Sequence, residues 1–257
     1  MWSTRWCWRC TAERVGAPGS TLSSIGPADG ASATRSTPAL ARCGAALLLR
    51  HIRNPVRLAR SVLSGSPHVA LAGEAAERFA AVRGVEVVDS TYFHSERRLQ
   101  GLLDARADPA AGHGTVGAVA RDGRHHLAAA TSTGGMTGKA AGRIGDTPLV
   151  GAGTYADERV AVSTTGHGEY FVRTVAAHRV ADLVELAGLG TSEAAARVVG
   201  EVGELGGSGG LLALDASGRL AMPFDTVMMP RGYVTSDGQV HVALYADEEP
   251  LAVAPSR

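Results

Sequence analysis

The sequence has few cysteines, few aromatic side chains and no excess charge of either sign. Three cysteines in 257 residues are too few for the disulfide framework of a secreted domain. The 25 basic and 25 acidic side chains cancel, which argues against nucleic acid or an anionic membrane as the partner. No apolar run approaches the roughly 20 residues that a membrane-spanning helix needs. We therefore expect no nucleic-acid partner and no membrane partner.

The amino-terminal region lacks the charged start, apolar middle and small-residue cleavage site of a secretory signal, so the expected compartment is the cytoplasm. Cys7 and Cys10 have CxxC spacing, but no second CxxC and no histidine pair at ligand spacing follows them. His113, His125 and His126 also lack the spacing of metal ligands. We therefore expect no metal and no cofactor.

Composition divides the chain near residue 50. All three tryptophans and all three cysteines lie within the first 43 residues, in a stretch without helical or strand periodicity. We interpret residues 1–50 as an atypical segment, either disordered or the product of a mis-started reading frame. The regular pattern begins at about residue 51.

From residue 51 onward the pattern predicts helices that alternate with short strands. Asn54 is a good N-cap with Pro55 at the first helical position, and the helix ends before Ser66. Residues 74–82 predict a second helix, which ends at Gly84 in a left-handed conformation. The other predicted segments are a short buried strand at 68–72, a loop at 104–114, a hairpin of strands 115–120 and 126–131, one long helix at 169–187, a helix at 191–199 and a second hairpin of strands 211–215 and 219–224. Helices that flank antiparallel hairpins predict an α+β sandwich rather than a sheet built from βαβ units.

A candidate nucleophile lies where a loop gives way to a strand, at Gly114–Thr115 in HGTVGAVA (113–120). A threonine hydroxyl is a weak nucleophile unless a base takes its proton, and a chain-terminal threonine can use its own α-amine as that base. A free α-amine has a pKa of about 7.7–8, so part of it is neutral near pH 7. Gly114 would let the backbone adopt the strained geometry that attack on the peptide bond requires. On the residues alone, the ordinary start of a strand is the competing interpretation.

The first hairpin brings further hydroxyl groups toward this threonine. A turn centred on Asp122–Gly123 would place Thr115 opposite Ala130. Thr131 and Thr133 would then lie within diagonal reach on the partner strand.

Several segments, in this order, carry a resemblance to a known family: HGTVGAVA (113–120), AATSTGGMTGKAAGRIGDTPLVGAGTYA (129–156), STTGHGEYFVR (163–173) and GGSGGLLALD (206–215). Together with HIRNPVRLARSVLSGSPHVALAGEAAERFA (51–80), they resemble the isoaspartyl peptidase/L-asparaginase family of threonine-type N-terminal nucleophile hydrolases. The resemblance implies the αββα four-layer sandwich of that class. It also implies that residues 51–114 are the remnant of the first (alpha) subunit and residues 115–257 the second (beta) subunit.

The resemblance also implies roles for single residues. Thr115 matches the nucleophile that the precursor exposes by cutting itself between Gly114 and Thr115, and Thr133 matches a threonine that assists it. Arg143 and Asp146 match a clamp that binds the α-carboxylate and the α-ammonium group of the substrate. The remaining expected substrate-binding residues are the neighbours Ile144 and Gly145, the oxyanion-stabilising pair Thr165 and Gly166, and His167 and Gly168.

The implied function is hydrolysis of L-asparagine or β-aspartyl dipeptides through a threonine acyl-enzyme, a route that needs no cofactor. The family also implies that cleaved subunits pair into a heterotetramer. The family opens with an HGGAG-like strand and a sodium-binding glycine-rich loop, and residues 1–50 contain neither string. We therefore expect a sandwich that is incomplete at the N-terminus. The alternatives are an N-truncated, catalytically impaired homologue and a glycosylasparaginase-like hydrolase.

Overall fold

The computed structural model describes residues 28–35, 42–107, 113–248 and 251–253. They form two units, the larger within residues 28–225 and the smaller within residues 226–253, and each is described by itself. In the described part of the chain, no helix has the length and apolar character needed to cross a membrane.

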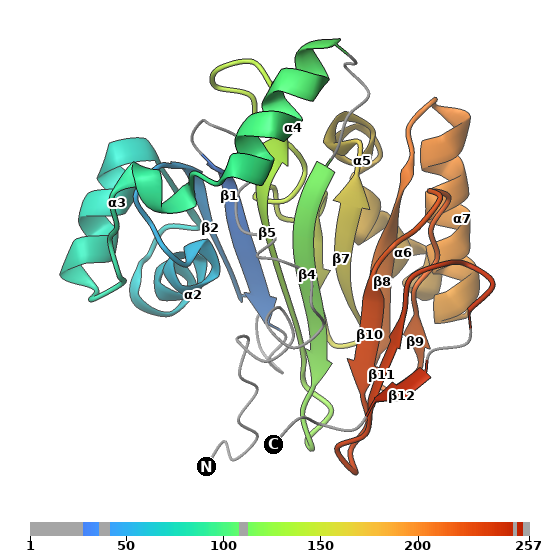
Figure 1. Cartoon of the computed structure of the whole chain (residues 1–257). Helices are drawn as coiled ribbons and strands as arrows, with labels where there is room; N and C mark the ends of the chain where they lie inside the picture. Colours follow the sequence, from blue (N-terminus) through green and yellow to red (C-terminus); the bar gives the residue numbers. More distant parts are fainter. Residues whose placement is uncertain (1–27, 36–41, 108–112, 249–250, 254–257) are drawn as a thin grey trace. The chain divides into compact units, whose positions relative to one another are not determined.

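The larger unit contains a five-stranded sheet with the strand order β3-β2-β1-β5-β4. Figure 1 shows β2, β1, β5 and β4 side by side. Neighbouring strands pair antiparallel, except that β2 and β3 are parallel. The strands are β1 Ala28–Arg35, β2 Arg42–Leu49, β3 Ala70–Ala72, β4 His113–Arg121 and β5 Leu127–Met136.

Strands β1 and β2 show that the interpretation of residues 1–50 as an atypical segment is wrong for two stretches. Residues 28–35 and 42–49 pair with each other, and β1 also pairs with β5, so both strands lie inside the sheet. They showed no strand signal because β1 holds mainly small residues and β2 ends in three leucines, whereas strands favour β-branched and aromatic residues. Residues 1–27 and 36–41 lie outside the described residues.

Helices α2 and α3 pack against this sheet. α2, Pro55–Gly65, is capped as predicted: the Asn54 side chain accepts a hydrogen bond from the backbone N–H of Arg57 at 3.1 Å. α3, Gly73–Val82, ends before Gly84, which has the expected left-handed φ of 67°. Their buried side chains form a core cluster with β2 and the adjoining loops: Ala46, Leu49, Ile52, Leu58, Val62, Ala76, Ala80 and Val85. Burial of this apolar surface holds the helices on the sheet.

Two predicted segments of this region are wrong in part. β3 occupies only residues 70–72 and lies at the sheet edge with little cover, so the strand predicted at 68–72 is not buried. The predicted loop at 104–114 is too long, because helix α4, Glu96–Ala107, extends into it and β4 begins at His113. Residues 108–112 lie outside the described residues. A short 3₁₀ helix, η1 Ser90–Phe93, precedes α4.

A second, four-stranded antiparallel sheet packs face to face on the first, with the strand order β6-β7-β8-β9. Its strands are β6 Thr154–Ala156, β7 Val160–Gly166, β8 Gly209–Asp215 and β9 Leu220–Ala221. The predicted second hairpin is therefore confirmed, although β9 is shorter than expected. Leu127 and Ala129 of β5 meet Ala156 and Ala161 of this sheet in a buried apolar cluster.

Three helices pack against the second sheet: α5 Gly168–Thr174, α6 Ala176–Glu185 and α7 Thr191–Glu204. The helix predicted at 191–199 is confirmed and is longer, but the single helix predicted at 169–187 is wrong. The break occurs at Val175, whose φ of 51° lies in the left-handed region that a β-branched residue disfavours. Tertiary hydrogen bonds hold this break, because the backbone N–H groups of Ala177 and His178 donate to the carbonyls of Ala152 and Gly151 at 3.1 and 2.8 Å.

The smaller unit contains a three-stranded antiparallel sheet, β10 Arg231–Val234, β11 Val240–Ala243 and β12 Leu251–Val253. The sequence pattern predicted no strands there. In the described chain as a whole, helices combine with largely antiparallel sheets, which confirms the predicted mixed class.

Candidate active site

Thr115 and Thr133 face each other on neighbouring strands near the start of β4. The Thr115 hydroxyl donates to Thr133 Oγ1 at 3.2 Å, and the Thr133 hydroxyl donates to the carbonyl oxygen of Gly114 at 2.9 Å. The backbone N–H of Gly135 donates to Thr133 Oγ1 at 2.9 Å. Thr133 is buried and Thr115 is half-buried, so water competes little for these bonds. The hydroxyl predicted to attack and the carbonyl predicted to be cut thus both hydrogen-bond to Thr133.

The predicted register of this hairpin is wrong. Thr115 pairs with Thr133 and not with Ala130, because the connection holds five residues, 122–126, rather than two. The carboxylate of Asp122 accepts hydrogen bonds from the backbone N–H groups two and four residues further on, at 2.8 and 2.9 Å, and this capped loop replaces a tight Asp-Gly turn. The real register places the two threonine side chains directly opposite each other.

Arg143 and Asp146 converge beside the first residue of α5, Gly168. The Arg143 guanidinium holds the carboxylate of Glu169 with two bonds, from Nε at 2.8 Å and from Nη2 at 2.9 Å. The hydroxyl of Thr164 donates to Asp146 Oδ2 at 2.6 Å. A Cβ at Gly168 would lie 2.7 Å from Asp146 Oδ1 and 3.0 Å from Arg143 Nη2, so only glycine lets both side chains approach. The structure therefore brings the predicted clamp residues together.

The two residues between Arg143 and Asp146, Ile144 and Gly145, differ in burial. Gly145 is buried, and a Cβ there would lie 2.7 Å from Arg143 Nη1, so a larger residue would displace the guanidinium from this position. Ile144 is half-buried.

Asp146 is a buried carboxylic acid, with a residue exposure of 5%. Burial raises its pKa to about 6, although the Thr164 hydrogen bond and the charge of Arg143 oppose this shift. Glu169 shows the opposite behaviour: the hydrogen bond from Arg143 lowers the pKa of its carboxyl against a smaller effect of burial. Near neutral pH the site therefore presents an ionised Asp146 that gains from a cationic partner.

The raised pKa predicts that Asp146 lowers stability above about pH 6. The unfolded carboxyl has a pKa of about 3.9, so the unfolded chain releases this proton first as the pH rises, and the free energy of unfolding falls between about pH 4 and 6. Asp146→Asn removes this titration. Its free energy of unfolding, relative to that of the unaltered chain, should therefore rise by on the order of 3 kcal/mol as the pH increases from 4 to 7.5. Urea unfolding of both chains across this range measures the difference.

Asp215→Asn is the matched control, because Asp215 is also buried but its pKa is lowered. Burial raises that pKa, and hydrogen bonds from Ser217, the Arg219 backbone and Thr191 outweigh the effect. Its carboxylate stabilises the folded chain above the unfolded pKa, so Asp215→Asn should lose stability relative to the unaltered chain as the pH rises. A pH-independent difference for Asp146→Asn would contradict the raised pKa.

The predicted oxyanion pair lies at the end of β7, where β7 and β8 approach closely. Gly166 has a φ of 139°, and a Cβ there would lie 2.3 Å from the carbonyl oxygen of Ser208. The backbone N–H of His167 donates to that same oxygen at 2.9 Å, and its ring lies 3.5 Å from Ser208 Oγ. Thr165 is half-buried and pairs with Gly210. These contacts fix the turn through which β7 enters α5.

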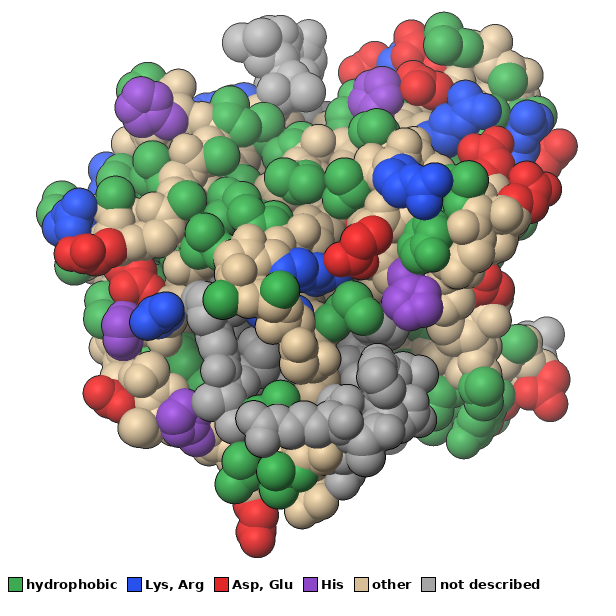
Figure 2. All heavy atoms as spheres, turned by 90° about the horizontal axis from the view of Figure 1, so that it is seen from above, with side chains coloured by type: hydrophobic (Ala, Val, Ile, Leu, Met, Phe, Trp, Pro, Cys, Tyr) green, Lys and Arg blue, Asp and Glu red, His purple; other side chains and the backbone are tan. Residues whose placement is uncertain are grey.

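Thr115 and Thr165 lie at the same end of the two packed sheets. A Cβ at Gly117 would lie 2.0 Å from Ser163 Oγ, and Thr131 Oγ1 lies 2.7 Å from that atom, so β4 and β5 meet β7 at Ser163. Thr115 lies two residues from this point along β4 and Thr165 two residues along β7. Figure 1 shows the start of β4 and the end of β7 on the same side, beside α5. Viewed from that side, the acidic and basic side chains of the described residues are interspersed (Figure 2).

Buried hydroxyl groups hold the loop that carries Arg143 and Asp146. Ser32 of β1 donates to the carbonyl oxygen of Thr147 at 2.6 Å, and Thr154 donates to Thr131 Oγ1 at 2.5 Å. Both bonds fasten the chain to the first sheet after Asp146, at Thr147 and at Thr154. Sequence reasoning missed Ser32 because it missed β1, and it missed Glu169 and Thr164 because their partners lie 26 and 18 residues away.

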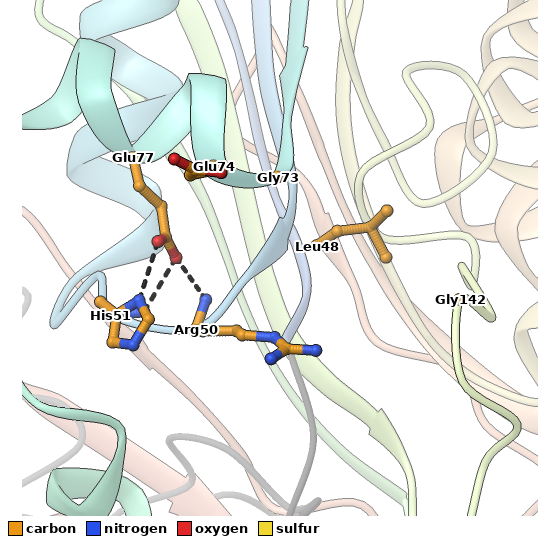
Figure 3. Close-up of a pocket in the computed structure, with 7 residues that line it drawn as sticks. All are labelled: Leu48, Arg50, His51, Gly73, Glu74, Glu77 and Gly142. Atoms are coloured by element: carbon orange, nitrogen blue, oxygen red, sulfur yellow. Dashed lines mark hydrogen bonds and ion pairs between the residues drawn. The ribbon is translucent and has the colours of Figure 1, made fainter.

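A cleft of about 530 Å³ lies beside the start of α3 (Figure 3). His51 Nδ1 lies 2.8 Å from Glu77 Oε2, and Glu77 also accepts the backbone N–H groups of Arg50 and His51. The other lining residues are Leu48, Gly73, Glu74 and Gly142. None of the predicted site residues lines this cleft, although Gly142 directly precedes Arg143.

Among the described residues, no group of three or more His, Cys, Asp or Glu side chains is arranged to hold a metal ion.

Known proteins resemble this chain across the whole region that carries the site. A family model described as asparaginase matches residues 37–244. The isoaspartyl peptidase of Escherichia coli (strain K12) is 49% identical over 207 residues, which cover 75% of this chain and 64% of that protein. The isoaspartyl peptidase of Salmonella typhimurium is 48% identical over 207 residues, covering 75% and 66%. A putative isoaspartyl peptidase/L-asparaginase of Dictyostelium discoideum is 39% identical over 226 residues, covering 72% and 65%.

The chain thus spans slightly less than two thirds of the length of these curated relatives. The matched region contains both threonines, the Arg143–Asp146 loop and the turn at the end of β7. A match of this extent over these residues makes the chain a member of the asparaginase family.

Proposed function

We propose that this chain is an amidohydrolase that frees Thr115 by cutting itself after Gly114 and then hydrolyses L-asparagine or β-aspartyl peptides. The observation that carries the proposal is the hydroxyl pair of Thr115 and Thr133 bonded to the carbonyl of Gly114. The names of the relatives, isoaspartyl peptidase and isoaspartyl peptidase/L-asparaginase, support the proposed hydrolysis and its substrate class.

Self-cleavage begins when Thr115 Oγ1 attacks the carbonyl carbon of Gly114. The Thr115 hydroxyl proton passes to Thr133 Oγ1 while the Thr133 proton passes to the carbonyl oxygen, which follows the hydrogen bonds of the folded chain. The C–N bond then breaks as the nitrogen takes up that proton, and an ester joins Gly114 to Thr115 Oγ1. Water hydrolyses the ester and leaves a Gly114 carboxylate and a free α-amine on Thr115, which can then act as a base.

Turnover uses the same hydroxyl. The Thr115 amine takes the hydroxyl proton and the oxygen attacks the side-chain carbonyl of the substrate. The amine then passes that proton to the leaving nitrogen, and ammonia or an amine departs before water releases the acyl group. The Arg143 fork binds the substrate α-carboxylate and Asp146 accepts hydrogen bonds from its α-ammonium. Groups at Thr165 and Gly166 stabilise the developing oxyanion, which is worth about 3–4 kcal/mol for each donor.

We also propose the layer arrangement of the fold as part of this function. An αββα four-layer sandwich of the N-terminal nucleophile type is supported by three sets of contacts. Helices α2 and α3 contact the first sheet, the first sheet contacts the second, and α6 and α7 contact the second sheet. Division into subunits at Thr115, pairing into a heterotetramer and a cytoplasmic location stay predictions.

The test is to purify the whole chain and measure both reactions. We expect mass spectrometry to find fragments of residues 1–114 and 115–257, with ammonia released from L-asparagine or an amino acid from a β-aspartyl dipeptide. A folded chain that stays in one piece and inactive would support the impaired homologue instead. Cleavage at another peptide bond would contradict the assignment of Thr115.

A further inference from the structure

A chain of hydrogen bonds leads from Lys139, the one lysine of the sequence, to the proposed cleavage site. Lys139 Nζ donates to the carbonyl oxygen of Gly134 at 2.7 Å. The N–H at the other end of that same peptide group belongs to Gly135, and it donates to Thr133 Oγ1 at 2.9 Å. Thr133 in turn donates to the carbonyl of Gly114 at 2.9 Å. A positive charge thus lies three hydrogen bonds from the peptide carbonyl that must accept the nucleophile.

The ammonium group acts on this chain in two ways. It withdraws electron density from the Gly134–Gly135 peptide, which makes the Gly135 N–H a stronger donor, because hydrogen bonds in series polarise one another in a buried environment. It also fixes the orientation of that peptide. Gly135 has a φ of 81°, and a peptide between two glycines can rotate easily, which would turn its carbonyl oxygen toward Thr133 instead of its N–H.

The geometry of the lysine suits this task. Lys139 is half-buried, and its backbone N–H donates to the carbonyl of Met136 at 3.3 Å, so a tight turn returns the side chain to the end of β5. Every other basic residue of the chain is arginine. The ammonium group at the end of this side chain can donate to a single carbonyl oxygen.

We propose that Lys139 is a positioning residue for self-cleavage: it holds and polarises the Gly134–Gly135 peptide so that Thr133 can activate the Gly114 carbonyl. This inference rests on the proposed cleavage before Thr115. Lys139 acts through the Gly134–Gly135 peptide and Thr133, and it gives up no proton and forms no bond in the reaction.

The test compares three substitutions of Lys139 by the rate at which the 115–257 fragment appears. Lys139→Met keeps the length and removes the charge, and we expect cleavage to slow about tenfold, less than the loss of a donor that contacts the oxyanion directly. Lys139→Gln keeps a donor without charge and should be intermediate. Lys139→Arg keeps the charge and should stay within a few fold of the unaltered chain. Arg124→Met, in the loop at the far end of the hairpin, is the control and should cut normally.

Thermal unfolding in a Thr115→Ala background shows whether each variant folds before any cut is made. If the unaltered chain is never cut before Thr115, the proposed function fails. If it is cut and Lys139→Met is cut equally fast, only the role of Lys139 fails. If Lys139→Arg is as slow as Lys139→Met in a stable protein, the charge has no role and the inference is overturned. If Lys139→Met does not fold, the cleavage rates of the other two variants test the inference: Lys139→Arg must cut faster than Lys139→Gln, and equal rates would overturn it.

Discussion

Replacing Thr115 by alanine is expected to leave the chain in one piece. Alanine has no hydroxyl, so nothing can attack the Gly114 carbonyl from the following residue, and the Thr133 hydrogen bond to that carbonyl has no nucleophile to assist. Thr115→Ser should still cut, but more slowly, because it lacks the β-branch that restricts the rotation of the hydroxyl. Gel electrophoresis of the purified chains over time measures both rates.

Substitutions of the neighbouring residues Thr133 and Ser132 distinguish a chemical effect on cleavage from a structural one. Thr133→Ala removes the donor to the Gly114 carbonyl, and we expect cleavage to slow about a hundredfold, the usual cost of one preorganised donor. Ser132→Ala changes the adjacent residue of β5, which pairs with Val116, and should cut like the unaltered chain. Equal cutting in Thr115→Ala would contradict the assignment of the nucleophile.

The parts of the site that lie within one sequence segment could be predicted from the sequence. Arg143 and Asp146 follow from the family resemblance of their segment, since without it they would be expected to form only a surface ion pair, and the structure does place both beside Gly168. The facing of Thr115 and Thr133 was missed, because it depends on how many residues Asp122 caps in the connecting loop. An Asp-Gly pair does not by itself fix that number.

The partners that lie far apart in the chain could not be predicted. Glu169 meets Arg143 only because β7 turns into α5 beside the Arg143 loop, and Ser32 meets Thr147 only because β1 lies inside the sheet. Strand β1 depends on its neighbours for its stability, because its small side chains have little strand preference of their own. The break at Val175 likewise depends on carbonyl groups of another segment, which periodicity within a helix cannot reveal.

Replacing Arg143 by lysine is expected to lower kcat/KM for L-asparagine and β-aspartyl dipeptides about a hundredfold, which corresponds to roughly 2.7 kcal/mol. Arg143 has a side-chain exposure of 14% and already binds one carboxylate, that of Glu169, through two N–H groups. A substrate α-carboxylate needs the same planar fork, and lysine offers a single point charge with no preferred plane. Because the contact forms before the reaction begins, most of the loss should appear as a higher KM.

The same variant should cut itself at the normal rate, because the hydroxyl pair and the Gly114 carbonyl that carry out cleavage make no contact with Arg143 among their hydrogen bonds. Arg197→Lys is the matched control, since Arg197 is exposed on α7 and meets Glu201 through one close contact at 3.2 Å. Its kcat/KM should not change. An unchanged kcat/KM for Arg143→Lys would remove Arg143 from the substrate site. Loss of both cleavage and turnover would mean that Arg143 supports the fold through Glu169 instead of binding substrate.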